Sequence, residues 1–394
     1  MLNGCLFSRA NSVFKPMWRC SKPIFAVSIA MALVSCQSVS IDDSFNVQNS
    51  GAKPSGPAET FGSGSVPVSM IVNRTGAGGA NSTGLAYRNG AALAVKDLGA
   101  KSIKLTIYDA KGSSDRLQSL ARAEIGKKTR LLIIPGDAGS VSSVSSLAST
   151  GSPPIIALGP TSGQGVYSFL PRAADGLTAG IRYAAGGKRK TVLIIAPQSS
   201  ANSVLRSIKR GVENSITVSG IAPYLGSPAA ADFVRLFSAK LKRADIIAFA
   251  GNGNFVSTIA AELKKSPTYR KIALVGREDW SANLMKSPAL NGTIVATRDT
   301  SGSSLIAGRY NKTYSQRFSS SAAYAYDLVA LASGLVRAKG SSGLSRRQIN
   351  NTSGFGGTTG LFRFGTNGNA ERLYQISKIQ NGSLKVVQTS PAGF

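Results

Sequence analysis

The chain has 394 residues, with 46 Lys and Arg against 18 Asp and Glu, a formal net charge of +28 and no histidine. The lack of histidine excludes Ser-His-Asp and Cys-His catalysis and His-based zinc sites, because all of them need an imidazole. A carboxylate pair or a Ser-Lys pair stays chemically open, but we expect no enzyme activity, no cofactor and no metal site.

The N-terminus has the pattern of a secretory signal. Four basic and no acidic residues lie in positions 1–22, and a mostly apolar run follows at 24–35. That run is too short for a bilayer core, which needs about 20 residues. It ends in Leu-Val-Ser before Cys36, which resembles the lipobox of bacterial lipoproteins. The resemblance implies that the signal peptide 1–35 is removed and that Cys36 is the lipid attachment site. An ordinary signal that happens to end near a cysteine is the alternative.

Cysteine use agrees with export. Cys5 and Cys20 lie inside the signal, so Cys36 is the only cysteine left after cleavage, and no disulfide can form within one mature chain. Gln37 stands where an Asp would imply inner-membrane retention by resemblance, which favours the outer membrane. We expect a periplasmic protein anchored to a membrane through its lipid, without nucleic-acid partners, because export removes it from them and no aromatic residues interleave with its scattered cations.

Residues 36–65 are rich in Ser, Gly, Pro and Asn and poor in large apolar side chains. This composition predicts a flexible tether with a reach of roughly 30 Å.

From Val66 onward, short apolar runs alternate with amphipathic segments that have helical spacing. Several runs are apolar throughout, which is typical of strands buried on both faces of a parallel sheet. The predicted strands are Val66–Val72, Ile103–Tyr108, Leu131–Ile134, Pro154–Leu158, Val192–Ile195, Ile216–Pro223, Ile246–Phe249, Ile272–Val275 and Thr293–Ala296.

This alternation predicts an α/β fold with two doubly wound, Rossmann-like lobes around a ligand cleft. Lobe 1 spans 66–171 and is completed by about 301–345, and lobe 2 spans 172–300 and is completed by 351–394. Crossover segments near Pro171 and 297–301 join the lobes. Alternating segments on either side of Gln380-Asn381-Gly382 predict a C-terminal β-hairpin.

The order of these elements resembles the type I periplasmic solute-binding proteins of the Leu/Ile/Val-binding type. Gly84–Leu98 resembles the first helix of that family, Ala323–Ser333 its C-terminal helix with a Tyr-Asp pair, and Gly354–Phe364 its glycine-rich terminal segment. The segment around Gly276–Trp280 is closest to the branch of penicillin-binding protein activators. Better-known activators carry an additional N-terminal helical-repeat domain, and here only the short tether stands in its place.

The resemblance implies a ligand site at the carboxyl ends of the strands, where helix N-termini offer free N–H groups to carboxylates. In lobe 1, the side chains that fit are hydroxyls, although plain helix caps would have the same residue types. In lobe 2, an acidic residue could hold an ammonium group and Trp280 could cover an apolar part. The candidate ligand-binding residues are Thr75, Ser140, Thr161, Ser162, Asn252, Asn254, Glu278, Asp279 and Trp280.

Two functions follow from the resemblance. The first is a receptor for a small polar solute such as an amino acid, with an ABC permease as partner. The second is a regulator that contacts a peptidoglycan synthase. Pro197–Ser200 lacks the Asp-x-Tyr-Gly segment of many binding members, which favours the second. A third reading, an NAD enzyme, starts from the glycines after the first strand and Asp109, but Asn81 occupies the place of the third glycine.

The anchor assignment predicts that Cys36→Ser abolishes lipid attachment, because no other thiol follows the signal. Mass spectrometry of the N-terminal peptide should find no acyl chains, and the protein should be soluble or unprocessed. Acyl chains on the variant would show that the lipid is attached elsewhere.

Overall fold

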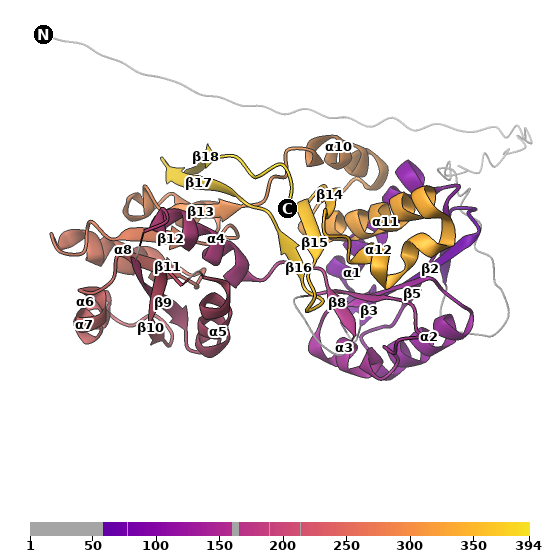
Figure 1. The fold of residues 1–394 in the computed structure, drawn as a ribbon, viewed down its shortest axis with the longest axis horizontal. Coiled ribbons are helices and arrows are strands. Elements are labelled where there is room, and N and C mark those ends of the chain that lie inside the picture. The colour runs from indigo at the N-terminus through magenta and orange to yellow at the C-terminus, as the bar shows by residue number, and fades with distance from the viewer. Residues whose placement is uncertain (1–57, 77, 160–164, 189, 213) are drawn as a thin grey trace, which may run out of the picture. The chain divides into compact units, whose positions relative to one another are not determined.

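Continuous apolar runs form the strands of this protein because helices cover both faces of each sheet, so that no strand residue needs to be polar. The computed structural model describes residues 58–394 except 77, 160–164, 189 and 213. Cys36 and the predicted signal therefore lie outside the described residues. Figure 1 shows two lobes, each with its own sheet and helices. Among the described residues, no helix has the length and apolar character needed to cross a membrane.

Lobe 1 is built on a six-stranded sheet in which five strands are parallel and one edge strand is antiparallel. In spatial order the strands are β1 (Glu59–Phe61), β5 (Ile103–Asp109), β2 (Val66–Val72), β6 (Leu131–Pro135), β7 (Ile155–Leu158) and β8 (Val166–Ser168).

Side chains on the two faces of the lobe 1 sheet belong to two separate hydrophobic cores. Val68 and Met70 belong to the core formed with α1 (Ser82–Ala94) and α11 (Ser320–Lys339), whereas Ile71 belongs to the core under α2 (Ser114–Gly126) and α3 (Ala138–Ser145). This alternation places α1 and α11 on one face of the sheet and α2 and α3 on the other. Four further helical elements among the described residues belong to the lobe 1 part of the chain, namely a π-helical turn (Val95–Gly99), α10 (Ser303–Tyr314), a 3-10 turn (Gly340–Leu344) and α12 (Arg346–Ile349).

Lobe 2 contains a seven-stranded sheet, parallel in its first five strands and antiparallel in the last two. In spatial order these are β10 (Ile216–Tyr224), β9 (Lys190–Pro197), β11 (Ile246–Phe249), β12 (Ala273–Gly276), β13 (Ile294–Thr297), β17 (Gln375–Gln380) and β18 (Ser383–Gln388).

Helices cover both faces of this sheet as well. Leu177 and Ile181 of α4 (Ala173–Ala185) and Ile208 of α5 (Ala201–Gly211) share one core with alternate strand residues. The opposite core contains Phe233 and Phe255. The helices on that side are α6 (Ala230–Leu236), α7 (Ser238–Leu241), α8 (Phe255–Lys265) and α9 (Ala282–Met285). The doubly wound α/β fold predicted from the sequence is thus confirmed.

One correction concerns the N-terminal boundary of lobe 1. The sequence predicts a flexible tether over 36–65, but Glu59–Phe61 forms the antiparallel edge strand β1 beside β5. Two of the three residues of β1, Glu59 and Thr60, are polar, so no apolar run marks this strand in the sequence. Glu59 forms ion pairs with both Arg74 and Arg88, and Phe61 is buried in the lobe 1 core.

A second correction concerns the C-terminal segment, which the sequence assigns to lobe 2 as a whole. Its first part forms a three-stranded sheet of β14 (Phe355–Gly357), β15 (Gly360–Phe364) and β16 (Ala370–Arg372), and Phe362 and Phe364 pack into the lobe 1 core. Only β17 and β18 join the sheet of lobe 2. Their turn at Asn381-Gly382 has positive φ at both residues, as the predicted hairpin requires.

A buried carboxylate fixes the start of this C-terminal segment to lobe 1. Asp327 on α11 is 2% exposed and accepts hydrogen bonds from the backbone N–H groups and hydroxyls of both Thr358 and Thr359. Gly357 precedes them because a Cβ there would lie 2.5 Å from Asp327 Oδ2. The two threonines form the turn between β14 and β15, so Asp327 holds this small sheet on the helix.

Asp327→Ala should therefore lower the free energy of unfolding by about 3 kcal/mol or more, since it leaves four buried donors without an acceptor. Asp299→Ala is the matched control, because Asp299 is exposed, and it should cost less than about 0.5 kcal/mol. Chemical denaturation of the full chain measures both. Equal losses would mean that Asp327 does not hold the segment.

Candidate functional site

The loops after the first two parallel strands of lobe 1 are joined by one carboxylate. Thr75 Oγ1 donates to Asp109 Oδ2 at 2.7 Å, and the backbone N–H groups of Arg74 and Lys111 donate to Oδ1 at 3.0 and 2.9 Å. Burial alone would raise the pKa of Asp109, but these hydrogen bonds hold it below its usual value. The predicted ligand residue Thr75 thus already donates its hydroxyl hydrogen to Asp109.

The second predicted hydroxyl of lobe 1 is also engaged. Asp137 is the N-cap of α3 and accepts from the Ser140 backbone N–H at 2.9 Å and from Ser140 Oγ at 2.6 Å. Ser140 is 4% exposed, so it completes a helix cap in this structure. Thr161 and Ser162 lie outside the described residues.

In lobe 2, Trp280 points into the core. It is 3% exposed, and its indole Nε1–H donates to the Gly251 carbonyl at 2.8 Å. Its ring packs so closely on Gly276 that a Cβ at that position would lie 2.3 Å from it. The structure therefore places Trp280 where it supports the sheet, and not on a surface that a ligand reaches. Asn252 and Asn254 are exposed before α8.

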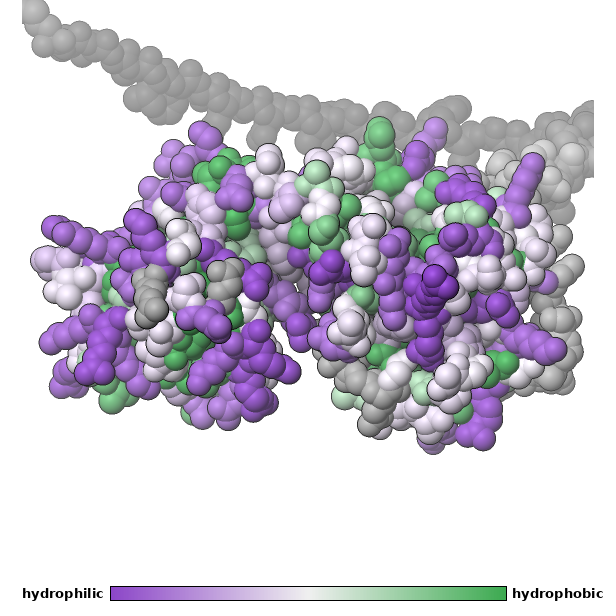
Figure 2. Space-filling view, viewed as in Figure 1, coloured by the Kyte–Doolittle hydropathy of each residue, from purple (hydrophilic) through white to green (hydrophobic). Residues whose placement is uncertain are grey.

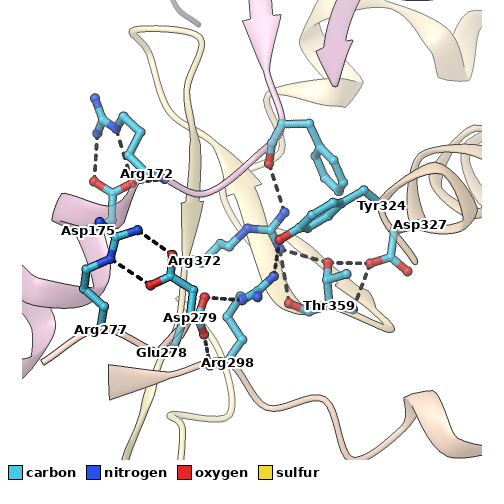
Figure 3. Close-up of polar contacts among 11 residues, drawn as sticks. Arg172, Asp175, Arg277, Glu278, Asp279, Arg298, Tyr324, Asp327, Thr359 and Arg372 are labelled. Atoms are coloured by element: carbon cyan, nitrogen blue, oxygen red, sulfur yellow. Dashed lines mark hydrogen bonds and ion pairs between the residues drawn. The ribbon is translucent and has the colours of Figure 1, made fainter. Parts of the chain in front are cut away.

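Glu278 is paired with an arginine twenty positions away, as Figure 3 shows. Its two oxygens accept from the Arg298 backbone N–H at 3.1 Å and from Arg298 Nε at 2.8 Å. Arg298 also donates to the Tyr324 hydroxyl on α11 and lies over that ring. This chain of contacts connects the loop after β12, the segment after β13 and a helix of lobe 1.

Asp279 is paired in the same way with its neighbour Arg277, whose Nε donates to Oδ1 at 2.7 Å. Arg277 also donates to the Ala250 carbonyl at 2.7 Å. Both acidic residues that the sequence offers for an ammonium group are thus ion-paired, and each faces a different arginine. The structure brings Glu278, Asp279 and Trp280 onto one loop, but it engages each with a different protein partner.

Arg372 on β16 is a buried cation that the sequence analysis did not single out. It is 7% exposed and donates to the carbonyl and hydroxyl of Thr359 and to the Phe169 carbonyl. Its guanidinium lies 4.8 Å from the Phe169 ring centroid, and the rings of Phe362 and Tyr324 are close by. Burial lowers its pKa. Among the described residues, no carboxylate lies within ion-pair distance of Arg372.

The polar contacts around Arg372 involve as many acids as arginines, because Asp327 accepts hydrogen bonds from the same Thr359 that Arg372 contacts. Arg172 pairs with Asp175, as Arg277 does with Asp279 and Arg298 with Glu278, and Arg372 is the fourth arginine. The sequence gives little indication of contacts such as Arg298 with Glu278, because the two residues lie on separate elements. Arg372 follows Glu371 in a polar stretch of the chain, so nothing in its local sequence marks it as buried.

A pocket lies elsewhere in lobe 1. It has a volume of about 280 Å³ and is lined by residues of β8, α12 and the turn after β15, including Tyr167, Arg346 and Asn350. None of the predicted ligand-binding residues that the structure describes lines it. No group of three or more His, Cys, Asp or Glu side chains in the described part of the chain could hold a metal ion.

A double-mutant cycle should separate the two acidic pairs. We expect a coupling free energy of about 1–2 kcal/mol for Glu278→Gln with Arg298→Met, because these side chains are 23% and 15% exposed. For Asp279→Asn with Arg277→Met it should stay below about 0.5 kcal/mol, since Asp279 is 51% exposed. Denaturant unfolding of the four variants and two doubles measures both, and equal couplings would contradict the difference in burial.

Comparison with known proteins gives the same fold. The ABC transporter substrate-binding protein from Sphaerobacter thermophilus matches with 14% identity, 82% of this chain, 96% of the other and a TM-score of 0.57. The branched-chain amino acid transporter substrate-binding protein from Streptococcus pneumoniae, in complex with isoleucine, matches with 16% identity. The match covers 83% of this chain and 99% of the other, with a TM-score of 0.51. The C-domain of LpoA from Haemophilus influenzae, a regulator of PBP1A, matches with 13% identity. The match covers 82% of this chain and 99% of the other, with a TM-score of 0.60.

A search of curated protein sequences finds no match. The family model for periplasmic binding proteins, in contrast, matches residues 65–383, which span both lobes and most of the C-terminal segment. The two sheets, the crossings between them and this match agree: the chain belongs to the periplasmic binding protein family.

Proposed function

We propose that this chain is a non-catalytic lipoprotein of the cell envelope that regulates peptidoglycan synthesis by contact with a synthase, and that it is not a standard amino-acid receptor. The observation that carries the proposal is the pairing of Glu278 with Arg298. An amino-acid receptor needs an acidic group for the ligand's ammonium, and here an arginine already occupies that group.

The energy of displacement supports this reading. Leaving one partner of a buried ion pair uncompensated costs about 3–5 kcal/mol, and the partial exposure of this pair puts the cost toward the lower end. A ligand of micromolar affinity gains only about 8 kcal/mol in total. An ammonium that had to displace Arg298 would thus lose a large share of its binding free energy.

Other features point the same way. Trp280 is in the core, and Pro197–Ser200 supplies neither an acidic nor an aromatic side chain after β9. Among proteins of the same fold, the LpoA C-domain is described as a regulator of PBP1A, which shows that this architecture serves regulation as well as transport. The predicted lipid on Cys36 would keep the chain in the envelope, where such synthases act.

A solute receptor is the second candidate, and one observation favours it. Arg372 has no acidic partner among the described residues, so the region has room for an added negative charge. This would suit an anionic solute better than a zwitterionic amino acid. Under this alternative the partner would be an ABC permease.

A thermal-shift screen of the full chain carrying Cys36→Ser distinguishes the two candidates. We expect no rise in Tm with any of the common amino acids, because Glu278 is occupied. A ligand at 100 times its Kd would add about 2.7 kcal/mol, a shift of a few degrees for this chain. A clear rise with leucine or another amino acid would sink the regulator proposal.

In the same preparation, we expect the chain to bind a purified penicillin-binding synthase of the same organism and to change its rate of glycan polymerisation or cross-linking saturably. Heat-denatured protein is the control. No binding and no change in either rate would refute the proposed function, whatever the ligand screen returns.

A further inference from the structure

The sheet of lobe 2 has two edge strands, β10 and β18, and they differ in how they are protected. An unprotected edge strand pairs readily with another chain, so proteins block such edges with bulges, prolines and covering side chains. β10 has all three. Its register shifts between Val218 and Gly220, Pro223 lacks an N–H group, and Lys240 Nζ donates to the Ile221 carbonyl at 3.2 Å.

β18 also has a register shift, at Val387, but among the described residues it has neither a proline nor a covering side chain that bonds its backbone. Five of its six residues are exposed, and Val386 and Val387 are 45% and 41% exposed. In an antiparallel pair, about half of the backbone groups of each strand point away from its partner. The outer side of β18 thus offers a row of hydrogen-bonding groups flanked by apolar side chains.

The C-terminal residues turn away from this edge. Phe394 packs against Gly354 and lies under the guanidinium of Arg363, 4.5 Å from ring centroid to Cζ, both on the segment that joins lobe 1. The last residue is therefore held at β14–β15, and the described C-terminal tail contains no strand beyond β18.

The charge at β18 indicates what kind of strand fits. Lys385 stands directly opposite Lys378 of β17, and like charges in that position destabilise a sheet. Neither lysine forms an ion pair with a described residue. Lys286 lies against the hairpin turn at Gly382. A carboxylate placed beside Lys385 would offset this repulsion.

We propose that β18 is the docking edge for the synthase, which adds an extended segment with a carboxylate side chain as an eighth strand of the sheet. This inference rests on the proposed function and names the surface through which it acts. Backbone hydrogen bonds along β18 provide the affinity, and the carboxylate facing Lys385 selects the segment. The protected edge β10 takes no part.

The test compares charge reversals in the full chain carrying Cys36→Ser, with the purified synthase as the probe in a titration. Lys385→Glu should weaken binding by about tenfold or more, although it replaces a repulsive pair with an attractive one and so should fold at least as stably. Val387→Ser, which removes exposed apolar surface from the same strand, should weaken binding less. Lys209→Glu on the exposed side of α5 makes the same change in net charge and should leave the affinity within about twofold.

The outcomes separate the two proposals. Binding by the parent chain that Lys385→Glu and Lys209→Glu reduce equally would overturn the docking edge and leave the proposed function in place. No binding by the parent chain would overturn both. Sedimentation of the chain alone checks a further possibility: a dimer that Lys385→Glu dissociates would show that a second copy occupies the edge, which also overturns the proposal.

Discussion

Buried charge is the constraint on which this structure depends, because a charge taken out of water must find its partners inside the protein. Asp327 meets this condition with four donors from Thr358 and Thr359. In doing so it fastens the small sheet β14–β16 to α11. Arg372 is the last residue of that sheet, and its guanidinium donates hydrogen bonds to Thr359 and to the Phe169 carbonyl. The last crossing between the lobes thus starts from a fixed point.

The same condition shapes the loops where a binding protein would hold its ligand. Each acidic side chain after β12 has an arginine, and each tested hydroxyl of lobe 1 has an aspartate. These contacts engage most of the predicted ligand residues that the structure describes, whereas Asn252 and Asn254 are exposed. The proposed function implies that the family fold is kept while its ligand chemistry differs, since the fold depends on the apolar cores and a ligand site on a few side chains.

The exposed strand β18 differs from the loops of the predicted ligand site. Most of the described loop residues are bonded internally, whereas β18 of lobe 2 exposes backbone and two valines beside Lys385. Figure 2 shows that hydrophilic side chains cover most of the visible surface of both lobes and that apolar residues form small separate patches. A short exposed strand on such a surface is a limited, specific feature.

The sequence by itself determined the nine apolar strands of the two sheets and the two-lobed α/β fold, because apolar runs and helical periods are local patterns that burial imposes. It also determined the hairpin, since Asn381-Gly382 accepts the positive φ angles that a two-residue turn demands. Tertiary structure alone decided that Glu278 meets Arg298, that Trp280 turns inward, that Glu59–Phe61 forms a strand, and that the C-terminal segment divides between the lobes. Such choices depend on which side chains far apart in the chain are brought together, and a polar residue carries no local sign of its partner.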